Sequence, residues 1–306
     1  MPKKYQILSF GEALIDFTPT SEGTYVPNVG GAPLNLVACA AKYGLRTAFV
    51  GKVGKDAFGK LIACTAEKCG IDTAGILWDD DRVTTHAFVT LDDTGERDFV
   101  FCREHGADAA LTSSELPKEM LADTELFHFG GLSLTNDELK TACFTALDYA
   151  ADNGAIVSFD PNYRPLLWKT PLDFVAACNE VLSKVDILKV SLEEALMLTG
   201  ERTEREAVSV LTSKVSAVLV TKGAEGAIWA KGDRVVFLPP TKACTVDTTG
   251  AGDIFFGVFL SAMLSGGYTP QSLDGEKAEV FGKKACYFAA KSTEKHGAIP
   301  SIPNFS

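Results

Sequence analysis

The sequence predicts an α/β fold in which a mostly parallel β-sheet is covered by helices on both faces and carries a small antiparallel β lid. Strand-like apolar runs alternate with stretches of helical periodicity, a pattern typical of right-handed βαβ units. Two stretches, 17–30 and 84–103, break the alternation with strand-like runs joined by turns, which predicts the lid. No internal repeat or interdomain linker is visible, so residues 1–306 are expected to form a single domain.

The strands expected in the parallel sheet are short and apolar, and helical stretches separate them. They are 6–10, 47–50, 126–129, 156–159, 187–190 and 218–221.

The first helices expected between these strands have readable ends. They are 33–44, 57–70 and 135–154. The first opens with Pro33, a residue favoured in a first helical turn, and it ends at a glycine. The third opens with a capping box formed by Thr135 and Glu138.

Within the second lid stretch, Asp92-Asp93-Thr94-Gly95 is a hairpin signal between two alternating runs. Strands joined this way do not fit inside a parallel sheet. We therefore expect them to lie over one end of it.

Composition narrows the function classes. A net charge of −11 argues against nucleic acid or an anionic membrane as a partner, because both require a basic face. The amino-terminal residues lack the apolar core of a secretion signal, and no apolar stretch reaches the length of about 18 residues that a membrane span needs. The eight cysteines form no C-x-x-C pair and are expected to be reduced thiols, and no zinc pattern is present. A cytoplasmic protein is expected.

The segment Gly250-Ala251-Gly252-Asp253 carries the clearest chemistry. It directly precedes 254–264, an apolar run expected to be a buried helix, so backbone N–H groups are left unpaired at the positive end of a helix dipole. Such an end binds anions, and its glycines allow a phosphate to approach. A hydroxyl held between that phosphate and Asp253 would lose its proton to the carboxylate. The alternative is a plain helix start without any ligand.

Two other phosphate-binding patterns are excluded here. No Gly-Lys-Ser/Thr follows, so this is not a P-loop, and Phe255 occupies the place of the third glycine of G-x-G-x-x-G. Nor does that glycine pattern follow the first expected strand, where Gly11-Glu-Ala-Leu stands instead, so a dinucleotide-dependent oxidoreductase is disfavoured.

Five motifs together resemble the ribokinase-like carbohydrate kinases, and bacterial fructokinases in particular. Asp247-Thr-Thr-Gly-Ala-Gly-Asp253 resembles the family's C-terminal signature, and Gly30-Gly-Ala-Pro-Leu-Asn35, followed by Gly51 to Gly59, its N-terminal one. The others, between and after these two, are Asp160-Pro-Asn-Tyr-Arg164, Thr221-Lys-Gly-Ala-Glu-Gly226 and Gly297-Ala-Ile-Pro-Ser301. The motifs stand in family order and the resemblance covers residues 5 to 303. It implies a doubly wound ribokinase-like fold with a β lid, and a homodimer formed through the lid.

The resemblance implies catalytic and sugar-binding roles for individual residues. Asp253 is the implied catalytic base, with an ordinary pKa near 4, and Gly250, Ala251 and Gly252 form the implied anion hole. Asp16, Gly30, Gly31 and Asn35 match residues that hold sugar hydroxyls, although spacing alone would make them turn and helix residues. Arg103 and Arg164 match arginines that meet the substrate, and Arg164 can alternatively touch the transferring phosphate.

Nucleotide and metal sites are implied in the same way. The implied ATP-binding residues are Ser191, Thr221, Lys222, Gly223, Gly226 and Gly252. Glu194 matches the glutamate of an Asn-x-x-Glu motif that places Mg²⁺ through water, but Ser191 replaces the asparagine, and the same two residues make a capping box. The residues implied for a monovalent cation such as K⁺ are Asp247, Thr249, Ser292, Lys295, Gly297 and Ser301.

The sequence therefore predicts transfer of the ATP γ-phosphoryl group to a primary hydroxyl of a ketose. The Gly-Gly-Ala-Pro-Leu-Asn segment favours D-fructose as the acceptor. Arg103 and Arg164 would also suit a carboxylate, so 2-keto-3-deoxygluconate is the alternative acceptor. A non-catalytic sugar-binding relative is disfavoured because both the base and the anion hole are intact.

Overall fold

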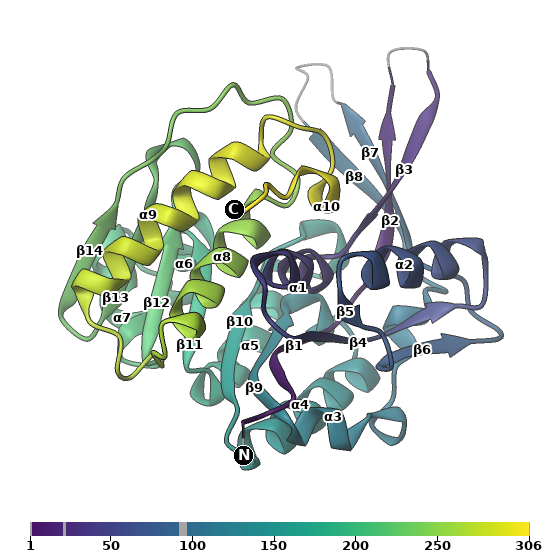
Figure 1. The fold of residues 1–306 in the computed structure, drawn as a ribbon, viewed down its shortest axis with the longest axis horizontal. Helices are drawn as coiled ribbons and strands as arrows, with labels where there is room; N and C mark the ends of the chain where they lie inside the picture. Colours follow the sequence, from purple (N-terminus) through teal and green to yellow (C-terminus); the bar gives the residue numbers. More distant parts are fainter. Residues whose placement is uncertain (1, 21–22, 92–96, 306) are drawn as a thin grey trace.

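The computed structural model describes residues 2–20, 23–91 and 97–305. A ten-stranded sheet runs through the molecule in the order β14-β13-β12-β11-β10-β9-β1-β4-β5, with β6 paired to β4 (Figure 1). Its strands are β1 (Tyr5–Phe10), β4 (Thr47–Gly54), β5 (Ile71–Asp72), β6 (Ile76–Asp79), β9 (Thr124–Gly130), β10 (Ile156–Asp160), β11 (Ile187–Ser191), β12 (Ala217–Thr221), β13 (Ala227–Lys231) and β14 (Arg234–Leu238).

The sheet is parallel except where β13 pairs with β12 and with β14. The six strands expected from the sequence are confirmed, each lying inside β1, β4, β9, β10, β11 or β12. The mostly parallel sheet of the predicted fold class is confirmed with them.

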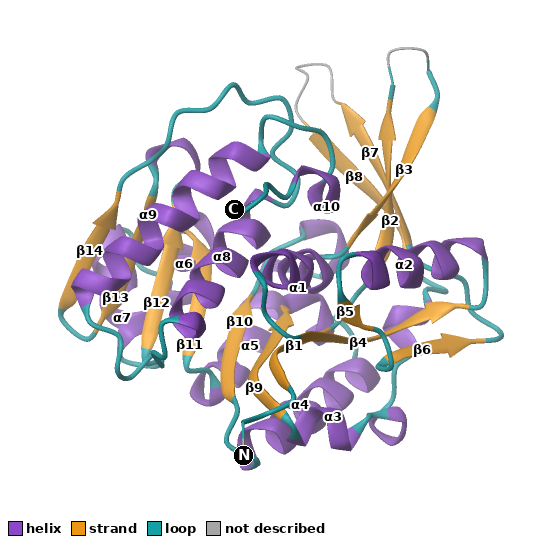
Figure 2. Ribbon diagram, in the orientation of Figure 1, coloured by secondary structure: helices purple, strands orange, loops and turns teal. Residues whose placement is uncertain are grey.

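Helices cover both faces of the sheet (Figure 2). They are α1 (Ala32–Tyr43), α2 (Ala57–Lys68), α3 (Lys118–Ala122), α4 (Asp137–Asp152), α5 (Pro171–Val181), α6 (Leu192–Thr199), α7 (Glu204–Thr212), α8 (Ala251–Ser265), α9 (Gly275–Ser292) and α10 (Ala298–Ser301). Short 3₁₀ turns span Ala107–Ala110, Ser113–Glu115, Gly131–Leu134, Pro165–Leu167, Leu182–Lys184 and Gly223–Glu225.

Each face of the sheet has its own apolar core. One core joins the sheet to α4, α5, α6 and α7, and the other joins it to α1, α8 and α9. The second core is built around α8, in which every residue from Asp253 to Leu264 is buried. The expectation of a buried helix over 254–264 is thereby confirmed.

The capping box expected at the start of α4 is wrong. Asn136, not Thr135, is the N-cap residue, and its side chain accepts a hydrogen bond from Leu139 N–H at 2.8 Å. The Thr135 hydroxyl instead donates to the Leu132 carbonyl and accepts from Arg103. A tertiary partner for Thr135 therefore moves the helix start by one residue.

A separate four-stranded sheet forms the lid, which projects from the main sheet at the upper right of Figure 1. Its strands, in the order β3-β2-β7-β8, are β2 (Leu14–Pro19), β3 (Tyr25–Gly30), β7 (His86–Leu91) and β8 (Arg97–Cys102). Two antiparallel hairpins, β2–β3 and β7–β8, are joined by a parallel pairing of β2 with β7. The turn expected at 92–95 lies outside the described residues.

Candidate active site

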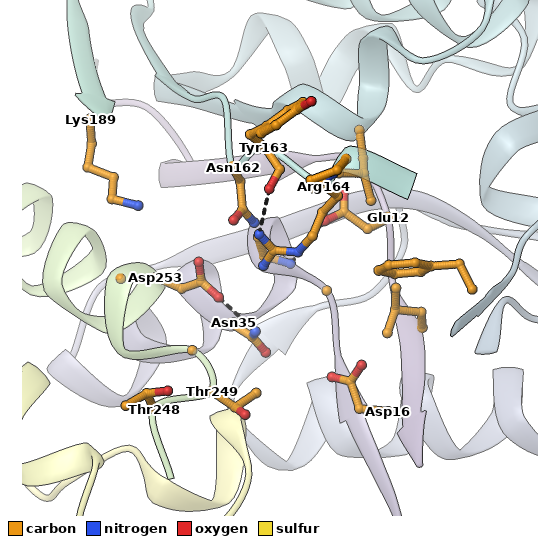
Figure 3. A pocket seen from close by; sticks show the side chains of 18 residues that line it. Glu12, Asp16, Asn35, Asn162, Tyr163, Arg164, Lys189, Thr248, Thr249 and Asp253 are labelled. Carbon is orange, nitrogen blue, oxygen red and sulfur yellow. Dashed lines mark hydrogen bonds between the residues drawn. The ribbon is translucent and has the colours of Figure 1, made fainter. Parts of the chain in front are cut away.

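The main sheet has its topological switch point at β1, because the chain continues to β4 on one side while β9 and β10 lie on the other. In doubly wound folds a ligand crevice forms outside the carboxyl ends of the strands at such a point. A cavity of about 530 Å³ lies there, lined by residues that follow β1 and β10, by lid residues and by the amino end of α8. Figure 3 shows its polar side chains converging from these elements.

The amino end of α8 has the geometry expected of an anion site. Gly250 is the N-cap residue, with a left-handed φ of 76°, and no side chain caps the first turn. Gly250 and Gly252 line the cavity, whereas the Ala251 N–H donates to the Thr248 carbonyl. The N–H groups of Gly252 and Asp253 have no acceptor within the helix, because they belong to its first turn. A phosphate group can be held there.

Asp253 lies on the cavity wall in that first turn. Its side chain is buried, and Oδ2 accepts a hydrogen bond from Asn35 Nδ2 at 2.8 Å. Burial raises the pKa of Asp253, while Lys189, the hydrogen bond from Asn35 and the charge of Arg164 act in the opposite direction. The expectation of an ordinary pKa near 4 is therefore wrong, because the carboxylate loses its hydration inside the fold.

Four of the implied sugar-binding residues, Asp16, Gly31, Asn35 and Arg164, line the cavity. Gly30 leaves room for the Asp16 side chain on this wall, since a Cβ at position 30 would lie 2.3 Å from Asp16 Oδ2. Burial raises the pKa of Asp16 to about 7, against the effect of the Arg164 charge, and Asp253 and Asp247 raise it further.

Arg103 does not line the cavity. Its side chain is buried, and Nε donates to Asp108 Oδ2 at 2.7 Å. Nη1 donates to Thr135 Oγ1 at 2.7 Å and Nη2 to the Leu132 carbonyl at 3.2 Å. The arginine pair considered from the sequence is thus divided, because Arg103 anchors the end of the lid while Arg164 faces the cavity.

Arg164 reaches the cavity through a turn that follows β10. In this turn Asn162 has a φ of 46°, the left-handed region that asparagine tolerates better than most residues. The Arg164 guanidinium donates to the Tyr163 carbonyl at 3.1 Å, and its side chain extends between Glu12 and Asp253 in Figure 3.

The residues implied for ATP binding lie along the neighbouring strand ends. Ser191 and Thr221 are paired at the carboxyl ends of β11 and β12. Lys222 forms an ion pair with Glu204 at 2.9 Å. Gly223 and Gly226 have left-handed φ angles of 55° and 94°. Among these residues only Gly252 lines the 530 Å³ cavity.

Ser191 and Glu194 form the capping box that was the alternative interpretation of their spacing. Glu194 Oε2 accepts from Ser191 N–H at 2.7 Å, and Oε1 accepts from Tyr163 N–H at 2.6 Å. Each carboxylate oxygen keeps a further lone pair that can accept from a metal-bound water. Glu194 can therefore cap α6 and also accept a hydrogen bond from a water bound to Mg²⁺.

The residues implied for a monovalent cation come from the loop before α8 and from the segment that runs from the end of α9 through α10, and the two contact each other. Asp247 Oδ1 accepts from Thr249 N–H at 2.8 Å and Oδ2 from Gly297 N–H at 2.9 Å. The Thr293 carbonyl accepts from Asp247 N–H at 3.0 Å. In the same region the Ser292 carbonyl accepts from Lys295 N–H at 3.2 Å, and the Ser301 hydroxyl donates to the Ala298 carbonyl at 2.8 Å.

These loops offer oxygens rather than soft ligands, and oxygens suit a hard cation. In the described part of the chain, no cluster of three or more histidine, cysteine, aspartate and glutamate side chains is placed to hold a metal ion. No helix of that part combines the length and apolar character needed to cross a bilayer.

Sequence reasoning missed Lys189 and Glu12, which both line the cavity. Lys189 stands in the apolar run Ile187-Leu-Lys-Val190, and a charged residue in a buried strand was the available signal. Glu12 is buried, and burial raises its pKa to about 7, against hydrogen bonds from backbone N–H groups and the charge of Arg103.

Comparison with known proteins agrees with this fold. Fructokinase-1 from Zea mays is 38% identical over an alignment covering 97% of this chain and 94% of the maize protein. A fructokinase double mutant from Vibrio cholerae O395, solved with fructose, ADP and potassium, has a TM-score of 0.90 at 28% identity, covering 100% of this chain and 97% of that one. A fructokinase from Xylella fastidiosa with bound ATP has a TM-score of 0.88 at 29% identity, covering 98% and 95%.

The fold, with its lidded α/β sheet, is thus similar to that of these two solved fructokinases. A model of the pfkB family of carbohydrate kinases matches residues 4–304. The chain belongs to the pfkB family of carbohydrate kinases.

Proposed function

We propose that this enzyme is an ATP-dependent fructokinase that phosphorylates a primary hydroxyl of D-fructose. The observation that carries the proposal is the placement of Asp253, which lies in the first turn of α8 on the wall of a cavity that also contains Asp16 and Asn35. A carboxylate acceptor, a helix amino end and hydroxyl-binding groups then meet at one place. The fructokinases among the similar proteins support the choice of sugar.

The reaction follows from this arrangement. Asp253 accepts the proton of the attacking hydroxyl, whose oxygen forms a bond to the γ-phosphorus. The bond from that phosphorus to the β–γ bridging oxygen breaks, and its electron pair leaves on ADP. The N–H groups at the start of α8 donate to the equatorial oxygens, where charge spreads in a loose transition state. Asp16 and Asn35 orient the sugar, which makes the step effectively unimolecular.

The environment of Arg103 favours fructose over 2-keto-3-deoxygluconate. Recognition of a carboxylate by two arginines requires both guanidinium groups at the substrate, and Arg103 is already engaged with Asp108. Of the two arginines, Arg164 is the one that lies on the cavity wall, where either a hydroxyl or a carboxylate could meet it. The acid sugar therefore stays the second candidate.

The nucleotide lies along Ser191, Thr221, Lys222, Gly223 and Gly226 in this proposal, with its γ-phosphate at Gly252. Mg²⁺ accompanies ATP and neutralises charge on the phosphates, and Glu194 orients a water bound to it. K⁺ is held beside the anion hole by oxygens of Asp247, Thr249 and the 292–301 loop. The Vibrio cholerae fructokinase form with fructose, ADP and potassium supports this last assignment.

A cytoplasmic homodimer is part of the same proposal. The dimer forms through the lid, whose strands expose Tyr25, Val26 and Val100. The eight cysteines are free in the structure, which suits a reducing compartment.

The test is an assay of ADP release with fructose, ribose, adenosine, 2-keto-3-deoxygluconate and fructose 6-phosphate, followed by NMR of the product. We expect fructose to give the highest kcat/KM and a product phosphorylated on a primary carbon. A phosphorylated secondary hydroxyl, or a higher kcat/KM for any of the other four acceptors, would overturn the assignment.

A further inference from the structure

A lysine stands in the middle of the parallel sheet, where an apolar residue would be expected. Lys189 belongs to β11, and its neighbours Ile187, Leu188 and Val190 are fully buried, while Lys189 itself is 6% exposed. An ammonium group loses its hydration when it is buried, and an apolar side chain of similar volume is often at least as favourable for stability. The position therefore indicates a function for the charge.

Asp160 holds the ammonium group in one place. Its Oδ2 lies 2.9 Å from Lys189 Nζ, and the two residues directly follow the paired residues Phe159 and Leu188 of strands β10 and β11. Asp160 is only 1% exposed. Burial lowers the pKa of Lys189, but Asp160, Glu194 and Asp253 outweigh that effect and raise the pKa overall, so the lysine stays protonated at neutral pH.

The side chain of Lys189 is directed at the anion site. It lines the cavity, and in Figure 3 it points toward Asp253 at the start of α8. A Cβ added to Gly252 would lie 3.0 Å from Lys189 Nζ, so the ammonium group packs against the backbone of the first turn. Asp160 is the hydrogen-bond partner of Nζ among the described residues, which leaves N–H donors for a ligand.

We propose that Lys189 is a further catalytic residue, whose ammonium group donates to an oxygen of the transferring phosphoryl group, and that Asp160 is its positioning residue. The inference rests on the proposed kinase function. Lys189 keeps its proton throughout, since Asp253 takes the proton of the sugar hydroxyl. The new O–P bond forms, the bond to the bridging oxygen breaks with its electron pair on ADP, and the fixed positive charge stabilises the equatorial oxygens.

The test compares Lys189→Met, Lys189→Arg and the double variant Lys189→Met/Asp160→Asn. The double variant is included because Lys189→Met leaves a buried carboxylate without its partner and can unfold the protein. Lys184→Met is the matched control, since Lys184 forms an ion pair with Asp148 at 2.5 Å on the surface. Circular dichroism and thermal melting identify the variants that remain folded.

In folded Lys189→Met or the double variant we expect kcat to fall by about 10²- to 10³-fold, the loss seen when one donor to a developing charge is removed. The KM for the sugar should stay within about threefold, because in this role Lys189 acts mainly in the transition state. Lys189→Arg should recover part of kcat, and Lys184→Met should match the wild type.

A binding measurement separates catalysis from structure. Aluminium fluoride mimics the transferring phosphoryl group, so in the presence of sugar and Mg²⁺ it should tighten ADP binding to the wild type and to Lys184→Met. In Lys189→Met and in the double variant this tightening should be at least tenfold smaller. Without aluminium fluoride, both should bind ADP with the affinity of the wild type. Retained tightening, or a kcat loss that only follows the folded fraction, would overturn the role of Lys189.

The acceptor is identified first with the wild type. If another sugar replaces fructose, the proposed acceptor fails and the Lys189 measurements are made with that sugar. If the wild type phosphorylates none of the five acceptors, the proposed function and the role of Lys189 both fail.

Discussion

Asp253 is a buried carboxylate whose surroundings act on its proton affinity in opposite directions. Burial raises its pKa, and Lys189, Asn35 and Arg164 oppose that rise. A catalytic base performs best when its pKa is close to the working pH and its carboxylate form is still populated. The environment of Asp253 therefore suits it better to proton transfer than an exposed aspartate would be.

Replacing this base tests its role directly. Asp253→Asn keeps the shape and removes the proton acceptor, so kcat should fall by about 10²- to 10⁴-fold, the contribution typical of a positioned base. Steady-state kinetics and calorimetric titration with ADP measure the two effects, and ADP affinity should be retained. Activity within threefold of the wild type would remove Asp253 from the mechanism.

The pH profile of the wild type gives an independent check on the same residue. An acid with a raised pKa loses its carboxylate form at a higher pH than an exposed aspartate, so kcat should begin to fall at a higher pH than an exposed aspartate would give as the pH is lowered. A profile that falls only at or below the pH at which an exposed aspartate titrates would contradict the raised pKa.

Arg103 contributes to stability rather than to the cavity. Arg103→Ala leaves Asp108 buried without its charge partner, and the expected loss is about 3–5 kcal/mol of unfolding free energy. Urea denaturation measures it. The double variant Arg103→Met/Asp108→Leu removes both charges and should recover much of the loss.

Arg164→Ala is the comparison for the second arginine. It should raise the KM for the sugar with little change in unfolding free energy, because Arg164 lines the cavity. A rise in KM for Arg103→Ala with unchanged stability would reverse the two roles.

At the scale of the element, helix α8 belongs both to the apolar core and to the candidate active site. Its body is buried between α1, α9 and the sheet, and its first turn is the proposed anion site. Gly250 begins the helix in the left-handed region, and a Cβ there would lie 2.5 Å from Ala298 Cβ in α10. The glycine thus allows α8 to start where two loops and α10 meet.

Gly250→Ala should therefore reduce both stability and rate. The left-handed conformation costs an alanine about 1–2 kcal/mol, and the contact with Ala298 adds to that cost by displacing the first turn. Gly200→Ala is the matched control, because Gly200 has a φ of 74° with no atom within 4 Å of the added Cβ. We expect a similar strain penalty without loss of kcat in Gly200→Ala, as measured by urea denaturation and ADP release. Equal kcat in the two variants would contradict the role of the first turn.

At the scale of the whole molecule, local patterns predicted much and long-range pairings were missed. The six buried strands and the helix after Gly252 could be predicted because apolar runs and glycines act over a few residues. Lys189 pairs with Asp160 across 29 positions, and Arg103 pairs with Thr135 across 32. The sequence contains these residues, but which of them become hydrogen-bond partners depends on how strands and turns pack in the fold.

The two lid hairpins illustrate the same limit. Each hairpin could be anticipated from alternation and turn residues, but the parallel pairing of β2 with β7 joins strands from distant parts of the chain. The strands β13 and β14 were missed although they are as long as β10, β11 and β12. No helix lies between β12, β13 and β14, so they break the alternation of strand and helix by which the other strands were recognised.

The choice of acceptor depends on the whole molecule, since the lid, the turn after β10 and α8 all contribute to the cavity. An internal competition assay measures this choice most directly. Equal concentrations of fructose and 2-keto-3-deoxygluconate, with limiting ATP, give phosphorylated products whose ratio equals the ratio of the two kcat/KM values. The structure predicts at least a tenfold excess of fructose phosphate, because Arg103 is engaged away from the cavity and a site that binds hydroxyls rejects sugars lacking them. An excess of phosphorylated ketodeoxygluconate would contradict the account.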